Sequence, residues 1–202
     1  MLTLDALDTR LSVPSRQLAA PGPDDAQLMR MLQTATRVPD HGKRVPFRLL
    51  RIVGDTRLAL ADAAEARLRE REPDAGDAVA QKLRTRFTAP PLTLAVIARL
   101  GFDEKIPASE RAATASCVCL LLLQAAQAEG FGAQWLTGWP AYDRPFLEGA
   151  LGLSPDEQLA GTIAIGTPLV AVPERERPDV ATLLTDLRLE AAGDGTAGGR
   201  IA

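Results

Sequence analysis

The sequence predicts an α+β layer architecture, in which a modest sheet packs against one long buried helix. Short apolar strands are mixed with helices, without the regular alternation that is typical of a doubly wound parallel sheet. The segment 112–129 is apolar on nearly all sides, which places it at the centre of the fold or at a subunit interface. With 202 residues, 46% of them hydrophobic, the chain has the size of one soluble domain. We expect that domain to cover residues 1–190, followed by a mobile, Gly-rich tail over 191–202.

The N-terminal part begins with a short helix over residues 2–9 and a proline-rich loop over 10–23. Apolar residues at helical spacing predict an amphipathic helix over about 24–37, which an acidic pair at its start can cap. The run 45–53 is apolar and β-branched at its end, so it predicts a strand. A proline near its start restricts that start to a sheet edge or an entry position.

The middle of the chain alternates between strong helix formers and apolar runs. Ala, Leu, Arg and Glu favour a helix over 55–71, and a weaker helix follows over about 76–87. Two prolines end it and open the continuous apolar run 92–99, which is typical of a central strand buried on both faces. After a loop, the long helix over 112–129 ends at Gly130.

The C-terminal part predicts two further strands and two helices. One strand covers about 133–138, and Asp143 caps a short helix that ends near residue 151. A fourth strand covers 159–166, and a last helix covers 178–190.

Composition and motifs exclude several classes of function. The sequence has no Walker phosphate loop and no Gly-x-Ser-x-Gly, so a P-loop or serine hydrolase site is unsupported. A single histidine and scattered carboxylates predict no metal site. The net charge of -3, with dispersed basic residues, indicates no nucleic-acid partner.

Without a signal peptide or a long uncharged apolar stretch, we expect a cytoplasmic protein with no membrane partner. Cys117 and Cys119 are interpreted as buried apolar residues.

Two polar clusters stand out from this scaffold. Arg37, His41 and Lys43 lie in an irregular turn after a helix, a common place for a ligand site. Alternatively, the turn only caps the free carbonyls of that helix. Arg10 and Ser12 together offer a guanidinium fork and a hydroxyl that suit a phosphate, although an arginine after a helix is more often a solvated charge.

A series of short motifs occurs in a fixed order over residues 4–170. They are Leu4 to Ser12 with the proline-rich run to Pro23, Arg37-Val38-Pro39-Asp40-His41, Pro46-Phe47, Ala89-Pro90-Pro91-Leu92, Ile106-Pro107 through Glu110, Gly130-Phe131-Gly132 followed by Trp135, and Gly166-Thr167-Pro168. In this order they resemble the FMN-dependent nitroreductase family, most closely its short, single-domain NAD(P)H nitroreductases.

The resemblance implies a nitroreductase-like α+β fold, with a mostly antiparallel sheet and the long central helix at a dimer interface. It also implies an enzyme, an FMN-containing homodimer that binds each flavin between its subunits. NADH or NADPH would reduce FMN, which would then reduce a nitro compound, a quinone or a similar small molecule by a ping-pong mechanism. Because the chemistry takes place on FMN, no protein residue is expected to be catalytic.

The resemblance also transfers site residues. Arg10 and Ser12 would hold the ribityl phosphate, with Leu11 between them, and Arg37 and His41 would bind the flavin from the turn. Three residues would border the isoalloxazine ring from the other side: Trp135, Leu136 and Thr137. A nicotinamide nucleotide site would lie at Ala125, Ala126, Gln127, Ala128, Glu129 and Gly130.

One departure from the family pattern leaves a second function open. Leu11 stands where the family signature has its second arginine, and Arg16 is a candidate to restore that charge. Arg37 is the first choice, and Lys43 the second, for a cation that stabilises the anionic reduced flavin. With the signature arginine lost, the alternative is a flavin-binding protein without turnover that serves in storage, sensing or partner binding. A third possibility, an all-helical regulator without a cofactor, conflicts with the apolar strand over 92–98.

Overall fold

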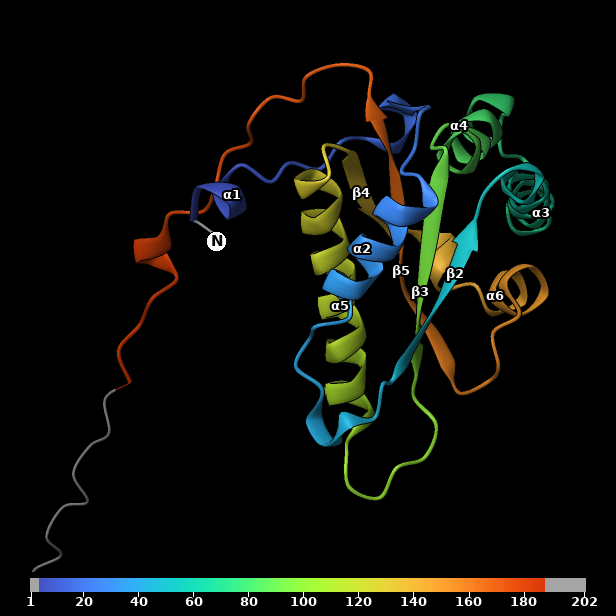
Figure 1. The fold of residues 1–202 in the computed structure, drawn as a ribbon. Coiled ribbons are helices and arrows are strands. Elements are labelled where there is room, and N and C mark those ends of the chain that lie inside the picture. Colours follow the sequence, from blue (N-terminus) through green and yellow to red (C-terminus); the bar gives the residue numbers. More distant parts are fainter. Residues whose placement is uncertain (1–3, 188–202) are drawn as a thin grey trace, which may run out of the picture. The chain divides into compact units, whose positions relative to one another are not determined.

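The structure, a computed structural model, describes residues 4–187 and confirms an α+β fold with helices on both faces of an antiparallel sheet (Figure 1). Contacts divide the chain into two units, Met1–Val172 and Pro173–Ala202, and all of the sheet lies in the first. The expected domain end at residue 190 stays a prediction. The expected mobile tail over 191–202 lies outside the described residues.

Helices and strands follow the expected order. The helices are α1 (Leu4–Asp8), α2 (Asp25–Ala35), α3 (Asp55–Arg71), α4 (Asp77–Thr88), α5 (Ala108–Ala128) and α6 (Arg144–Leu151). The strands are β1 (Leu18–Ala19), β2 (Phe47–Ile52), β3 (Leu92–Arg99), β4 (Gly132–Leu136) and β5 (Glu157–Pro168). Short 3-10 turns lie at Ser15–Gln17, His41–Lys43, Trp139–Ala141 and Val180–Thr182.

The longest strand, β5, organises the sheet. It pairs with β3 from Leu92↔Ile165 to Arg99↔Glu157, with β4 near its end, and with β1 at its last two residues. The strand β2 pairs with the other edge of β3, and every pairing is antiparallel. The continuous apolar run predicted as a central strand is therefore β3, which is buried on both faces as far as Ala98.

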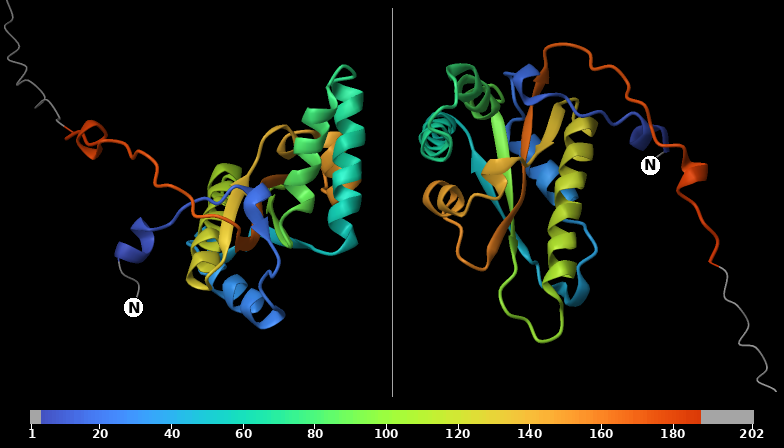
Figure 2. Two further views of the ribbon diagram at one scale, coloured as in Figure 1. Left: turned by 90° about the horizontal axis from the view of Figure 1, so that it is seen from above. Right: turned by 180° about the vertical axis from the view of Figure 1, so that it is seen from behind.

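Two layers of helices cover the sheet, as Figure 2 shows. Alternate side chains of β3, including Leu94 and Val96, pack against α2 and α5 on one face. The intervening Ala95 and Ile97 pack against α3, α4 and α6 on the other. The predicted layer architecture is correct, and the sheet lies between the two cores.

The long helix α5 begins at Ala108, four residues before the expected start, and is buried along one side only. It is long and apolar enough to span a membrane by length and composition, but half of its most apolar window is buried in the fold, as in a core helix. The other side exposes Ala113, Cys117 and Leu120. The expectation that both cysteines are buried is therefore wrong for Cys117, because residues two apart on a helix face opposite ways; Cys119 is buried.

Two other expectations need correction. The loop predicted over 10–23 contains a 3-10 turn and β1, whose two residues are too few to give a hydrophobic pattern. The helix predicted over 178–190 is wrong as far as residue 187, because only the turn Val180–Thr182 forms there. None of the residues 178–187 is buried, and a short helix without tertiary packing is marginal in water. Residues 188–190 lie outside the described part.

Candidate functional site

A cavity of about 740 Å³ opens between the N-terminal loop, α4 and the end of β4. Its walls come from the loop residues 14–16, from α4 between Ala78 and Arg86, from Gln134 and Leu136 on β4, and from the turn 138–140. Among the described residues that line it, three are cationic, namely Arg16, Lys82 and Arg86, and none is acidic. In a chain with a net charge of -3, such a wall favours an anionic ligand.

Arg86 is the most constrained of these cations. Its Nη2 donates to the carbonyl oxygen of Thr137, and its Nε is buried without a hydrogen-bond partner. No carboxylate contacts it within the described chain, and burial lowers its pKa to about 10. The side chain therefore remains protonated at neutral pH while one of its donors stays unsatisfied.

The turn after β4 allows Arg86 to lie close to the backbone. Gly138 has a φ of +71°, and a Cβ at this position would lie 3.1 Å from Nη1 of Arg86. A side chain here would be strained by the backbone conformation and would also crowd the guanidinium.

An ion-pair cluster around the buried Asp143 lies behind Trp139, which lines the cavity. Asp143 receives hydrogen bonds from Arg67 (2.8 Å) and Arg71 (2.7 Å), and it caps α6 at the Phe146 amide. These bonds, that from Arg67 first, hold the pKa of Asp143 well below its usual value despite its burial. The Arg71 guanidinium also lies 4.8 Å from the ring centre of Trp139, which lines the cavity. The cluster thus connects α3 to the turn that shapes the site.

The predicted phosphate pair lies on the chain segment that enters the cavity. Nη1 of Arg10 lies 3.3 Å from Oγ of Ser12, so the structure brings these two predicted residues together. The Ser15 amide then donates to Oε1 of Gln134 at 2.6 Å, which attaches the segment to β4. Leu11 lines a separate, smaller cavity of about 200 Å³. Arg16 lines the larger cavity, and its expected replacement of the missing signature charge stays a prediction.

Strand alternation separates the three predicted ring-contacting residues. Leu136 lines the cavity. The carbonyl oxygen of Thr137 accepts a hydrogen bond from Arg86, which also lines the cavity. The Trp135 side chain lies on the other face of β4, where its indole N–H donates to Ala160 O at 3.1 Å. Trp135 is therefore not among the described residues that line the cavity.

The polar turn does not cap the preceding helix. His41 Nδ1 lies 2.7 Å from Oε2 of Glu110, and Asp40 accepts a hydrogen bond from the amide of Val45 at 2.7 Å. Both side chains thus have partners other than the carbonyls of α2. Lys43 and Val45 adopt positive φ angles of 52° and 47°. Such angles are rare for residues other than glycine, above all for a β-branched residue such as Val45, and they are found most often at functional sites.

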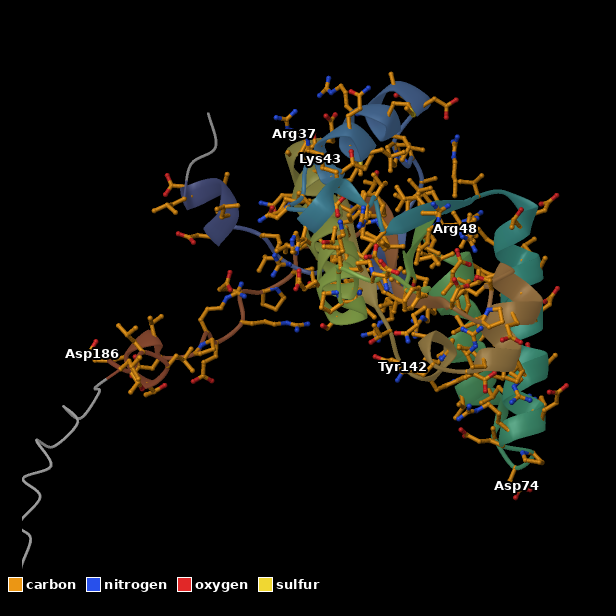
Figure 3. All side chains as sticks on the ribbon, turned by 90° about the horizontal axis from the view of Figure 1, so that it is seen from below. Arg37, Lys43, Arg48, Asp74, Tyr142 and Asp186 are labelled. Atoms are coloured by element: carbon orange, nitrogen blue, oxygen red, sulfur yellow. The ribbon has the colours of Figure 1, made fainter. Side chains whose placement is uncertain are left out.

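Arg37 and Lys43, labelled in Figure 3, come from the two ends of this turn, and both are exposed. The turn lies at the start of α5, since Thr114 Oγ1 donates to Pro39 O at 3.1 Å. The N-terminal segment lies at the end of α5, where Gln127 donates to Thr9 Oγ1 at 3.1 Å. Residues 110 and 127 are about 25 Å apart at the rise of an α-helix. One chain therefore presents the predicted flavin residues as two distant groups.

The residues predicted to bind a nicotinamide nucleotide form the end of α5. Ala125 and Ala126 are buried in the core, and Glu129 forms an ion pair with Arg30. Gly130 is exposed with a φ of +84°, and it lines the smaller cavity together with Gln127. This assignment stays a prediction.

Sequence reasoning missed the contribution of α4. Lys82 and Arg86 are four residues apart, so they share one face of the helix, and this spacing is the signal that could have indicated them. The turn residues Gly138 and Trp139 carry no comparable signal.

Comparisons with known proteins agree with this architecture. The Escherichia coli K12 protein named "Putative NAD(P)H nitroreductase YdjA" is 29% identical over 166 residues, which cover 82% of this chain and 89% of that protein. A "Putative NAD(P)H nitroreductase" of Haemophilus influenzae is 30% identical over 169 residues, 83% of this chain and 89% of its own. The solved nitroreductase-like protein of Bacillus cereus shares the fold, with a TM-score of 0.80 and 23% identity over 93% of this chain and 98% of its own. The model of the Nitroreductase family matches residues 7–167, and the chain therefore belongs to the nitroreductase family.

Proposed function

We propose that this protein is an FMN-dependent oxidoreductase that uses NADH or NADPH to reduce a nitro compound, a quinone or a similar small acceptor. The observation that carries this proposal is the cavity beside β4, to whose wall the described part of the chain contributes three cations and no carboxylate. The names of the Escherichia coli and Haemophilus influenzae relatives support the activity. A solved neighbour from Desulfovibrio desulfuricans, 22% identical with a TM-score of 0.68, is described in complex with FMN.

The residues present fit FMN in chemical type. FMN combines an anionic phosphate with a flat ring that has hydrogen-bond acceptors at one edge. The pair Arg10 and Ser12, with Arg16 nearby in sequence, supplies donors for the phosphate. The cavity adds apolar side chains, such as Leu136, and the unsatisfied Nε of Arg86. Leu136 and Thr137 would border the ring, with Trp135 contributing its backbone.

A homodimer completes this site. In one chain Arg37 and His41 lie at the opposite end of α5 from Arg10 and Ser12. A second copy packed antiparallel on α5 would bring its own polar turn to the first copy's phosphate pair. The exposed side of α5, which includes Cys117 and Leu120, is the surface we assign to this contact.

Bound FMN supplies the hydride chemistry in two half-reactions, first with NAD(P)H and then with the acceptor. The protein residues bind and orient it, and they exclude water with the apolar wall. The nicotinamide nucleotide would approach near residues 125–130, as expected from the resemblance. A cytoplasmic location is the setting we propose for it.

Anaerobic mixing with NADH or NADPH tests the proposal. The purified protein, saturated with FMN, should lose flavin absorbance when either nucleotide is added and regain it when a nitroaromatic or quinone follows. Tight FMN binding without bleaching by either nucleotide would instead support the alternative of flavin binding without turnover, for which the substitution at Leu11 is the motivating feature. A protein that binds no FMN would contradict both.

A further inference from the structure

We infer that Lys82 selects the electron acceptor and favours an aromatic compound that carries an anionic substituent, such as a carboxylate. This inference deepens the proposed function and rests on it, because it names the substrate class of the same cavity and the residue that recognises it. It concerns a part of the cavity wall to which we assign no contact with FMN.

The ammonium group of Lys82 is available to a ligand. The side chain lines the cavity, is exposed, and forms no ion pair with any residue that the structure describes. Arg84, two residues later on α4, instead pairs with Asp62 and Glu65 of α3. The residues three and four positions from Lys82 on either side include no carboxylate, so its own helix does not neutralise it.

The wall around Lys82 suits a ring that has one charge at its edge. Ala78 and Val79, about one turn earlier on α4, line the cavity together with Trp139 from the turn after β4. Val79 is 49% exposed, so a ligand can still cover its apolar surface. Apolar and aromatic side chains with a few well-placed polar groups are the usual lining of a small-molecule site. A ring can cover these side chains while its carboxylate reaches the lysine.

The position of Lys82 along α4 places this wall beside the flavin site. Lys82 precedes Arg86 by one turn on the same face of the helix, a rise of about 6 Å. Arg86 and Leu136 lie in the part of the cavity proposed to hold FMN. A substituted benzene ring spans a similar distance, so an acceptor that contacts the flavin can extend its substituent to Lys82.

A dinucleotide is the other source of anionic groups for this cavity. It carries at least two phosphate charges, and phosphate groups are normally bound by several cations or backbone amides. Once Arg16 and Arg86 are assigned to FMN, Lys82 is the one cation left among the described residues that line the cavity. A single cation beside apolar side chains matches a single carboxylate better than a dinucleotide.

The test compares the full-length, FMN-saturated wild type with Lys82→Met and with Lys105→Met, the matched control. Lys105 is exposed on the loop between β3 and α5, does not line the cavity, and forms no ion pair within the described part of the chain. The probes are 4-nitrobenzoate and 4-nitrobenzamide, which differ in charge and little in size. Their kcat/KM values are measured at low and high ionic strength, with NADH and with NADPH. A second readout is the affinity of the oxidised protein for benzoate and benzamide, which have no nitro group to reduce.

We expect Lys82→Met to lower the ratio of kcat/KM for 4-nitrobenzoate to that for 4-nitrobenzamide about tenfold. This is the low end for a charge-assisted hydrogen bond, because Lys82 is exposed. Benzoate affinity should fall by a similar factor, whereas the affinities for benzamide and FMN should not change. Higher ionic strength should lower the wild-type ratio and leave that of Lys82→Met unchanged, since salt screens an exposed charge. Lys105→Met should match the wild type.

Three results would overturn the inference while leaving the proposed function intact. Equal ratios in Lys82→Met and Lys105→Met exclude contact of Lys82 with the anionic substituent. An unchanged acceptor ratio with an altered preference between NADPH and NADH assigns Lys82 to the nucleotide. Weaker FMN binding in Lys82→Met assigns it to the flavin. A wild type that binds no FMN, or whose flavin neither nucleotide bleaches, is a different outcome, because the proposed function then fails and the inference fails with it.

Discussion

His41 and Glu110 form a hydrogen bond, with Nδ1 and Oε2 2.7 Å apart, that connects the polar turn to the first turn of α5. Both side chains are largely exposed, so the pair contributes at most about 1 kcal/mol to folding. The strained backbone at Lys43 and Val45 is therefore retained for a reason other than this contact.

Replacing His41 with Ala should weaken FMN binding about tenfold, the effect of losing one charge-assisted hydrogen bond. The free energy of unfolding should change by less than about 1 kcal/mol. Fluorescence titration with FMN and chemical denaturation measure the two effects. Glu110→Gln is the control, because it removes the carboxylate partner of His41 and keeps His41 itself, and it should retain most of the affinity. Unchanged affinity in His41→Ala, with slower reduction of the bound flavin, would refute the binding role.

The dimer proposal predicts different effects for two exposed leucines. Leu120 on α5 is 44% exposed and Leu58 on α3 is 47% exposed, so they differ in location more than in burial. Leu120→Glu should produce monomers in sedimentation velocity and should also reduce FMN affinity, because the partner's polar turn is lost. Leu58→Glu should leave the protein dimeric with normal affinity. Monomeric wild-type protein that binds FMN tightly would contradict the shared site.

Acid should unfold the protein partly through Glu157. The bonds from Arg48 at 2.6 and 2.8 Å, and to a lesser degree that from the Ser154 amide, lower the pKa of Glu157 to about 2. Because the folded-state pKa lies below the unfolded one, this group stabilises the fold fully above about pH 4.5, and its contribution is lost as the pH falls toward 2.

Glu157→Gln should therefore cost about 3 kcal/mol at pH 7 and should flatten the loss of stability between pH 4.5 and 2. Urea denaturation at a series of pH values measures both effects. The exposed Glu72, changed to Gln as a control, should alter stability by less than about 0.5 kcal/mol. An unchanged pH slope in Glu157→Gln would show that the ion pair is not the source of acid sensitivity.

The sheet and its main helices were predictable because local and tertiary preferences agree there. The run 92–99 is uniformly apolar, and it forms the strand that both helix layers cover. Residues 55–71 combine strong helix formers with a glycine before their start, and the helix α3 has these same bounds. In both cases the pattern of the segment alone determines its structure.

The cavity was less predictable, because its cations are brought together only by tertiary packing. Arg86 looks like an ordinary surface arginine in the sequence, and its isolation from carboxylates depends on how α4 lies against the turn at Gly138. The division of the flavin residues between the two ends of α5 likewise depends on the path of the chain, not on any motif. Motif order indicated which residues to consider, whereas only the fold shows which of them meet.

Arg16 provides the last prediction, since Leu11 occupies the place of the second signature arginine and lines a cavity of its own. Arg16 lines the larger cavity and has no ion-pair partner within the described residues, so its charge is available to the phosphate. Arg16→Ala should weaken FMN binding about tenfold while changing riboflavin binding little, because only FMN carries the phosphate. Arg51→Ala is the control, since it removes the same charge at a distant surface position, where Arg51 pairs with Asp25. Isothermal titration with both flavins decides the matter: equal FMN affinity in the two variants would show that Arg16 does not replace the missing arginine.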